Sequence, residues 1–355
     1  MQPLLFVAMV FFLDWALFRN MFMKKRIFFL VIVIVILVLL LLKFCNPRPM
    51  QPLEDGSKPS AAILKSELLR LSDDELKFAI DFMVFRDSKN TEGSVRGKDL
   101  SMDTLKRPLT VFSLTDFDKT NPKQKESFSA ILLVDHSGSM NTNDRDKKRF
   151  MAANIFNQNF GNDNYLMLWA FGITSKGYGA IGQGFVQDTA MFKKQLDSLQ
   201  MTRVAGGSPL FQAQDSTLQY LDLNAKTKIK ALLSLTDGMA GGKKAYDQAV
   251  SRSLQTNVPL YNISLKKDSE VLRQQALETN GAYIYVEETE ELLSIFGNLG
   301  SLVNKTAVVY HTEWVAKPVK GNLKFGKSLK HTLKVKLPYG EIIDLPFEID
   351  LVQSN

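Results

Sequence analysis

The sequence contains one cysteine, Cys45, and three histidines among its 355 residues. A single cysteine excludes an intrachain disulfide framework and any metal site built from several cysteines. Three histidines argue against a histidine-rich zinc site. Lys and Arg total 44 against 37 for Asp and Glu. No aromatic-and-basic pattern accompanies this small excess, so the composition does not support nucleic-acid binding.

One long apolar run stands near the N-terminus. Three basic residues, 24–26, precede sixteen uninterrupted apolar residues, Ile27–Leu42. A membrane-spanning helix takes about 20 apolar residues, and Lys43 can lengthen the span by placing its ammonium group at the interface. The basic cluster predicts that the N-terminal side is cytoplasmic. We therefore expect a single-pass transmembrane signal anchor at 24–45, with the rest of the chain periplasmic or extracellular.

Two other interpretations of the N-terminus stay open. The apolar run is longer than the roughly 7–15 residues of a signal-peptide core, and no A-x-A cleavage pattern follows it. A lipoprotein would carry its acylated cysteine after small residues, whereas Lys43 and Phe44 precede Cys45, so this interpretation is the weaker one. Within residues 1–23, the segment 3–18 is apolar apart from Asp14, and residues 1–23 are either a second span or the product of an early start codon.

Between the anchor and the first long strand the pattern is mixed. The segment 46–106 begins with proline and polar residues, which are typical of a linker. Within 71–85, Ser72 and Glu75 have the spacing of a capping box ahead of apolar residues, which predicts a helix. We therefore expect a linker and a juxtamembrane helical segment over 46–106. A β-strand and a turn follow over 107–127.

From residue 128 to 303 apolar runs alternate with segments of helical spacing. The expected strands are 129–135, 164–172, 228–237, 258–265 and 282–286. The expected helices are 146–160, 188–199, 209–221, 243–256, 268–280 and 288–303. Such alternation implies parallel strands joined by helical crossovers. The predicted fold class is α/β, with a doubly wound, mostly parallel sheet flanked by helices.

The period of the pattern changes to two in the C-terminal region. From Leu329 to Leu337, apolar residues and histidine alternate with lysine and threonine, which is typical of a strand with one buried face. Together with 306–314 and 343–352, this strand predicts a small antiparallel β unit over 304–355. The strand expected near 107–117 can join the same sheet. The α/β region would then be an insertion into a β-sandwich.

Oxygen-bearing side chains follow the predicted buried strands. The segment "ILLVDHSGSM" places Asp135, Ser137 and Ser139 at the end of one strand; Ser208 lies in "GGSPL" at the start of a helix, and Asp237 ends another strand in "LTDG". Binding crevices of open α/β sheets lie at the carboxyl ends of the strands, so we expect these side chains to meet. Each one alone also has a simpler explanation, such as a helix N-cap for Ser208 or a turn for Asp237.

In their order, the motifs D-x-S-x-S, GGSPL and LTDG resemble the metal-ion-dependent adhesion site of von Willebrand factor A domains. The resemblance covers residues 128–303 and implies a divalent-ion site made of Asp135, Ser137, Ser139, Ser208 and Asp237. Serine stands at 208 where the family pattern has threonine. The implied ion is Mg²⁺, with Mn²⁺ or Ca²⁺ as alternatives, because hydroxyl and carboxylate oxygens suit hard cations. The helix-to-strand exit after 303 is similar to that of membrane-linked bacterial members.

The resemblance implies a membrane-anchored, non-enzymatic protein that binds an Asp or Glu side chain of a protein partner at an open position of the ion. The alternative is an accessory subunit of an AAA⁺ ATPase-driven assembly or chelatase-like complex. Partners of that kind are usually cytoplasmic, so membrane topology separates the two. A catalytic triad is improbable, because Asp135, His136 and Ser137 are consecutive and side chains on an extended chain alternate in direction. No G-x-S-x-G elbow is present either.

The anchor interpretation predicts how the protein fractionates. Because an uncleaved apolar helix holds a chain in the bilayer, the protein should stay in the membrane pellet at full length after an alkaline carbonate wash. Immunoblotting of the pellet and supernatant measures this. A shortened chain in the supernatant would instead show cleavage.

Overall fold

The computed structural model describes nine stretches of the chain. They are residues 57–103, 110–120, 126–161, 163–173, 177–204, 206–238, 242–304, 306–319 and 328–351. All of them fall within one unit, Gln51–Asn355. Among the helices of these stretches, none is both long and apolar enough to cross a bilayer. The predicted anchor at 24–45 and the apolar segment 1–23 lie outside the described residues.

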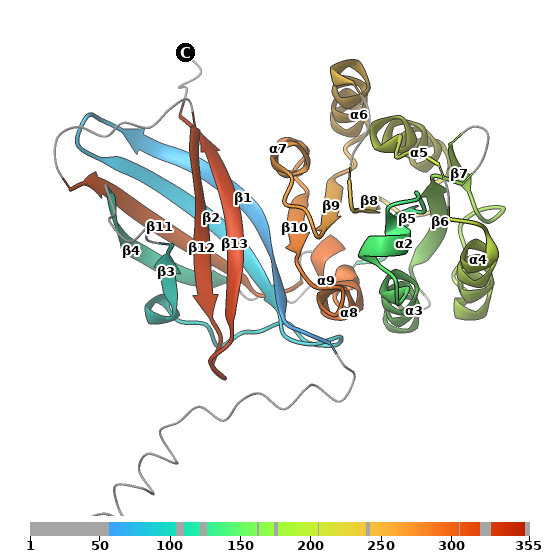
Figure 1. The fold of residues 1–355 in the computed structure, drawn as a ribbon, viewed down its shortest axis with the longest axis horizontal. Helices are drawn as coiled ribbons and strands as arrows, with labels where there is room; N and C mark the ends of the chain where they lie inside the picture. Colours follow the sequence, from blue (N-terminus) through green and yellow to red (C-terminus); the bar gives the residue numbers. More distant parts are fainter. Residues whose placement is uncertain are drawn as a thin grey trace, which may run out of the picture. The chain divides into compact units, whose positions relative to one another are not determined.

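Ten strands form one large sheet (Figure 1). They are β1 (Ser60–Leu71), β2 (Leu76–Phe85), β4 (Thr110–Thr120), β5 (Phe128–Asp135), β6 (Tyr165–Phe171), β7 (Tyr178–Ala180), β8 (Ile229–Thr236), β9 (Leu260–Leu265), β10 (Ala282–Val286) and β11 (Val309–Pro318). Their order is β4-β11-β2-β1-β10-β9-β8-β5-β6-β7. Strands β10, β9, β8, β5 and β6 are parallel, whereas β4, β11, β2 and β1 pair antiparallel.

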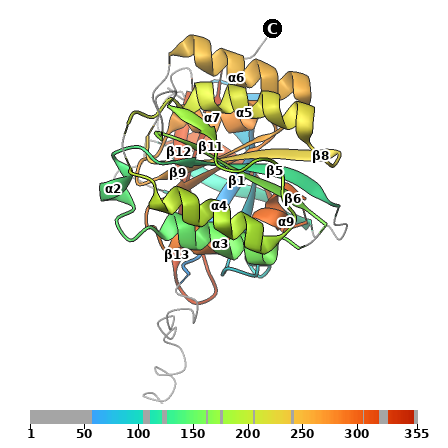
Figure 2. The ribbon, with the colours of Figure 1, turned by 90° about the vertical axis from the view of Figure 1, so that its right-hand side faces the viewer.

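Helices cover both faces of the parallel strands (Figure 2). One face carries α3 (Lys148–Asn159), α4 (Thr189–Met201), α8 (Glu291–Gly297) and α9 (Leu299–Val303). The other carries α5 (Leu210–Asn224), α6 (Lys243–Thr256) and α7 (Glu270–Glu278). Along β5, Leu132 joins the first core and Leu133 the second, so the strand is buried on both sides. The predicted mixed α/β fold with a helix-flanked, mostly parallel sheet is confirmed.

A second, three-stranded sheet completes a β-sandwich. Its strands are β3 (Leu100–Met102), β12 (Ser328–Lys336) and β13 (Ile342–Asp350), in the order β13-β12-β3. The rings of Phe78 on β2 and Phe347 on β13 lie 5.7 Å apart in the shared core. Leu333 on β12 is fully buried there, as the period-two pattern predicts. In the chain, the α/β region lies between β4 and β11, which pair with each other. It is therefore an insertion into the sandwich.

The prediction of a helix over 71–85 is wrong. This segment forms the turn and second strand of a hairpin, with β1 before it and β2 after it. The backbone N–H of Glu75 donates to the hydroxyl of Ser72 at 3.2 Å, and the N–H of Ser72 donates to the carbonyl of Glu75 at 2.8 Å. The capping-box spacing thus closes a tight turn. Alternate side chains of β2 from Leu76 to Val84 fill the sandwich core, and this period of two decides the structure.

Smaller differences lie in the connections. The region expected to hold only a linker and a helical segment, 46–106, also contributes β3, and β4 continues to Thr120 where a turn was expected. The short edge strand β7 was not predicted. The helix expected over 288–303 is divided into α8 and α9 at Asn298, whose side-chain amide donates to the carbonyl oxygens of Asp87 and Ser294 at 2.6 and 2.8 Å.

Candidate functional site

Strand β5 carries Asp135 to the carboxyl edge of the parallel sheet. Asp135 is fully buried, and its carboxylate makes two hydrogen bonds. Oδ1 accepts from the backbone N–H of Ser137 at 2.8 Å, which turns the chain as it leaves the strand. Oδ2 accepts from the hydroxyl of Thr236 at the end of β8, also at 2.8 Å. Because β5 and β8 are parallel neighbours, their carboxyl ends bring these residues together.

A chain of hydroxyl groups continues from this point to Asp237. The Ser137 and Ser139 hydroxyl oxygens are 3.1 Å apart, and the Ser139 hydroxyl donates to Oδ1 of Asp237 at 2.7 Å. Asn143 donates to Oδ2 of the same carboxylate at 2.9 Å. Four of the five predicted residues therefore meet in one place. We call them the oxygen cluster: Asp135, Ser137, Ser139 and Asp237.

The hydroxyl of Ser139 does not cap a helix. Ser139 occupies the N-cap position of the short helix α2 (Met140–Asn143), yet its side chain makes no capping hydrogen bond. It donates to Asp237 across the sheet edge instead. Helix capping therefore leaves the position of this side chain unexplained.

The fifth predicted residue, Ser208, lies in a neighbouring loop. That loop contacts the oxygen-cluster loop through the backbone N–H of Gly138, which donates to the carbonyl of Gly206 at 3.4 Å. The Ser208 hydroxyl makes no hydrogen bond with another described residue, and helix α5 takes Pro209, not Ser208, as its N-cap. The interpretation of Ser208 as a helix cap is therefore wrong. Pro209 also lies one position earlier than the first helical position predicted for it.

The loop after β5 is packed closely against the end of β6. The N–H of His136 donates to the carbonyl of Phe171 at 2.9 Å. The next residue, Gly172, has a φ of +79°, and a Cβ atom there would lie 2.6 Å from the backbone nitrogen of Ser137. Only glycine fits this combination of left-handed backbone and close approach. The packing fixes the path of the loop that carries the serines.

His136 also supports the loop that carries the serines. The residue is fully buried. Its Nε2 lies 3.0 Å from the hydroxyl of Thr202, and its Nδ1 lies 3.4 Å from a guanidinium nitrogen of Arg149. Burial lowers the pKa of His136, and the charge of Arg149 lowers it further. The ring is therefore neutral at pH 7, and both its nitrogens are engaged.

Arg149 is held in turn by a buried ion pair. Its guanidinium group lies 2.5 Å from the carboxylate of Asp144, and the two side chains are 2% and 0% exposed. Sequence reasoning did not identify this pair, nor the contributions of Thr236 and Asn143. Thr236 directly precedes Asp237, and Asn143 follows Ser139 by four residues. Those spacings are the only signal for them in the sequence.

The two carboxylates of the oxygen cluster have no cationic partner within the described part of the chain. Asp135 and Asp237 are 0% and 7% exposed, and the hydrogen bonds to them come from neutral groups. Burial raises the pKa of Asp135, and the negative charge of Asp237 raises it further. Clustered carboxylate and hydroxyl oxygens are the ligands that Mg²⁺ and similar hard cations prefer. These residues therefore fit a divalent cation.

No family model matches this chain, and no curated protein matches it. Among solved structures, it is similar to a von Willebrand factor type A protein from Catenulispora acidiphila, with 12% identity and a TM-score of 0.43 over 84% of this chain and 75% of that chain.

Two pilus proteins are also similar. The pilus adhesin SpaC from Lactobacillus rhamnosus GG is 10% identical with a TM-score of 0.43, over 82% of this chain and 48% of that chain. The chain thus spans about half the length of that adhesin. The vWF domain of the type V pili tip protein Mfa5 from Porphyromonas gingivalis is 9% identical with a TM-score of 0.42, over 52% of this chain and 97% of that domain. Two of these three solved structures, the Catenulispora acidiphila protein and the Mfa5 domain, are named as von Willebrand factor proteins, and both are at most 12% identical to this chain.

The uncompensated carboxylates predict an unusual response to Asp135→Asn. A carboxyl group whose pKa is raised on folding binds its proton more tightly in the folded state than in the unfolded state. Protonated Asp135 therefore adds to the free energy of unfolding at low pH, and this addition is lost as the pH rises above about 3.8. In EDTA at pH 7, Asp135→Asn should therefore be more stable than the wild type, by about 1–4 kcal/mol. Excess MgCl₂ should stabilise the wild type but not Asp135→Asn.

Thermal melts of both proteins, with and without Mg²⁺, measure this response. Asp197→Asn is the matched control, because Asp197 is an exposed residue of α4 paired with Lys193, and it should behave like the wild type. If Asp135→Asn is less stable than the wild type in EDTA and still responds to Mg²⁺, the carboxylate is structural and the cation site is not there.

Proposed function

We propose that this protein is a non-enzymatic binding protein that holds Mg²⁺ at the oxygen cluster and uses the ion to bind a carboxylate of a protein partner. The observation that carries the proposal is the pair of buried carboxylates, Asp135 and Asp237, which share one sheet edge with serine hydroxyls and have no basic partner among the described residues. A bound divalent cation would compensate this charge.

The ligands follow from the chemistry of the side chains. Asp135, Asp237 and the hydroxyls of Ser137 and Ser139 supply hard oxygen atoms, and Ser208 would add a third hydroxyl from the neighbouring loop. Mg²⁺ takes six ligands in near-octahedral geometry and keeps some of its waters. Five side chains leave a position for an outside ligand, and a carboxylate from an Asp or Glu side chain of the partner suits a dication with hard-oxygen preference.

His136 supports binding over catalysis at this edge. It is the histidine nearest the serines in sequence, but its ring is buried, and its nitrogens are occupied by Thr202 and Arg149. A general base must reach the proton that it abstracts. A neutral ring enclosed below the loop is suited to holding that loop in place.

The predicted anchor would hold this activity at a membrane surface. The basic residues 24–26 before Ile27–Leu42 favour a periplasmic or extracellular location for residues after 45. A partner bound at the oxygen cluster would then lie outside the cytoplasm. A reporter enzyme fused after Asn355 that is active only outside the cytoplasm supports this location, and activity only inside would contradict it.

The binding function is tested by capture from solubilised membranes. The tagged wild-type chain, immobilised in MgCl₂, should retain a partner that is released by EDTA and restored by Mg²⁺. Ser139→Ala should fail to retain it, because the variant lacks a hydroxyl of the oxygen cluster, while Asp197→Asn should retain it. A partner that stays bound in EDTA, or that Ser139→Ala binds equally well, would contradict binding through the ion.

Ser208 allows a separate prediction. Because its hydroxyl has no partner among the described residues and it is not the N-cap of α5, Ser208→Ala should change the unfolding free energy by less than about 0.5 kcal/mol in EDTA. It should nevertheless weaken Mg²⁺ binding. Ser208→Thr should keep or strengthen binding, because the branched side chain restricts χ1 and can hold the hydroxyl in place. Calorimetric titration with Mg²⁺ compares the three proteins, and equal affinities for wild type and Ser208→Ala would remove Ser208 from the ligand set.

A further inference from the structure

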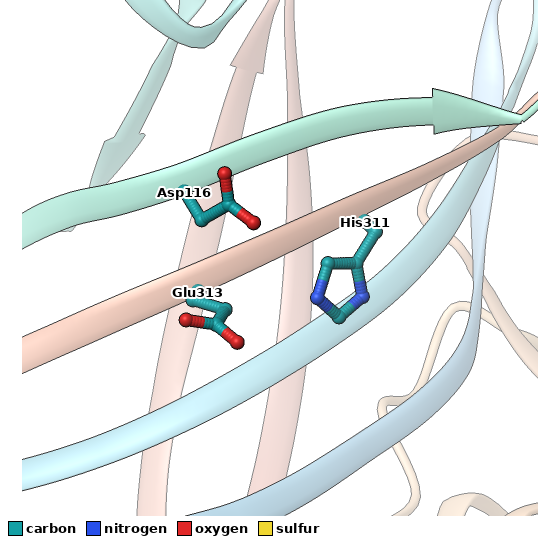
Figure 3. A group of neighbouring side chains, drawn as sticks. All are labelled: Asp116, His311 and Glu313. Carbon is teal, nitrogen blue, oxygen red and sulfur yellow. The ribbon is translucent and has the colours of Figure 1, made fainter.

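The outer face of the sandwich carries a second group of metal-ligating side chains, none of which belongs to the oxygen cluster. Asp116 lies on β4 opposite Glu313 on β11, and His311 lies two residues before Glu313 on the same face of the strand. One ligand atom from each residue lies within 4.8 Å of those of the other two. Figure 3 shows the three side chains on neighbouring strands. We call these three residues the His311 cluster.

A fourth residue fixes the orientation of the histidine. Asp81 on β2 is the register partner of His311, and its Oδ1 lies 2.6 Å from Nδ1 of the ring. A carboxylate that accepts from Nδ1–H leaves the lone pair of Nε2 free for a metal. In Figure 3 this second ring nitrogen points to the side of Glu313 and Asp116. The Asp81 carboxylate would thus bind one nitrogen of the His311 ring while the other nitrogen binds the metal, as in many protein metal sites.

The charge around the cluster is unbalanced. Asp81, Asp116 and Glu313 bring three carboxylates. Among the described lysines and arginines, Lys77 alone forms an ion pair with them, 2.5 Å from Glu313. The side chains of His311 and Glu313 are 38% and 25% exposed, so an ion can reach them from solvent. The site combines one imidazole nitrogen with carboxylate oxygens, whereas the oxygen cluster offers oxygens alone.

We propose that Nε2 of His311 and the carboxylates of Asp116 and Glu313 form a zinc site. Imidazole and carboxylate ligands suit Zn²⁺, while an all-oxygen site suits Mg²⁺. A tetrahedral ion with bonds of about 2.0–2.2 Å needs donor atoms about 3.4 Å apart. The side chains, whose ligand atoms lie within 4.8 Å of one another, would rotate to reach that spacing when the ion binds. Three protein ligands leave a fourth position for water or for a donor from another molecule.

The site would have a structural consequence for β4. This strand is the edge of the ten-stranded sheet and pairs only with β11 among the described strands. A zinc ion bound by Asp116 and by the two β11 residues would tie the edge strand to its neighbour. Zinc should therefore slow hydrogen exchange of β4 amides, in addition to its effect on thermal stability.

The test is calorimetric titration of ZnCl₂ into the full-length protein in detergent, with MgCl₂ in excess. The wild type should bind one equivalent, His311→Gln and Asp116→Asn should each lose at least tenfold in affinity, and Lys77→Met should bind more tightly, because its ammonium group no longer competes for Glu313. Asp344→Asn, which removes an exposed strand carboxylate paired with Lys334, should bind like the wild type. Asp135→Asn should also bind zinc normally, so this result is independent of the magnesium proposal.

Two results would overturn the zinc proposal. The first is equal zinc affinity in the wild type, His311→Gln and Asp116→Asn. The second is zinc binding that disappears in Asp135→Asn. Circular dichroism of each variant checks its fold. If His311→Gln does not fold, the zinc affinity of Asp116→Asn still tests the proposal, because Asp116 lies on an exposed edge strand. If zinc leaves the hydrogen exchange of β4 amides unchanged, the ion does not tie β4 to β11, and this result would also contradict the proposed site.

Discussion

Two buried carboxylates at the ends of parallel neighbouring strands are the constraint around which the candidate site is organised. Parallel pairing of β5 with β8 brings Asp135 and Asp237 to one sheet edge, and both are shielded from water. Like charges in such a place raise the free energy of the folded state unless protons or a cation compensate them. Neutral hydroxyl and amide donors orient the carboxylates but do not remove their charge. A cation bound beside the two carboxylates would therefore stabilise the folded state.

The surrounding structure holds the oxygen atoms in place before any ion arrives. Gly172 permits the loop after β5 to lie against the end of β6, and His136 ties that loop to Thr202 and Arg149. The buried ion pair of Arg149 with Asp144 fixes the guanidinium group. Ligands that are already positioned lose less conformational entropy on binding. This arrangement separates the support of the loop from the groups that would contact the ion.

Much of the fold could be predicted from the sequence, because the signals are long and periodic. Strands such as 282–286 and helices such as 243–256 are found with the expected bounds. The helix expected at 71–85 was wrong because Ser72 and Glu75 can serve a helix start or a tight turn with the same hydrogen bond. Pairing of β2 with both β1 and β11 decided between them, and β11 lies more than 200 positions away in the sequence.

The candidate site was also predictable where it depends on local sequence patterns, and not where it depends on how strands pair. Asp135, Ser137, Ser139 and Asp237 could be placed together because each ends or follows a buried strand of a parallel sheet. The hydrogen bond from Thr236 to Asp135 could not be predicted, since it depends on the register between β5 and β8. The pairing of Asp81 with His311 likewise depends on the register of β2 with β11. Registers of this kind are set by packing across the whole sheet.

Anomalous diffraction from crystals grown with MnCl₂ tests the central claim most directly. Manganese favours the same oxygen ligands as magnesium and can be located by its own anomalous signal. The account predicts a peak beside the Ser137 and Ser139 hydroxyls and the carboxylates of Asp135 and Asp237, with near-octahedral oxygen coordination. A lattice saturated with manganese that shows no peak at this edge, with the hydrogen bond from Ser139 to Asp237 unchanged, would contradict it.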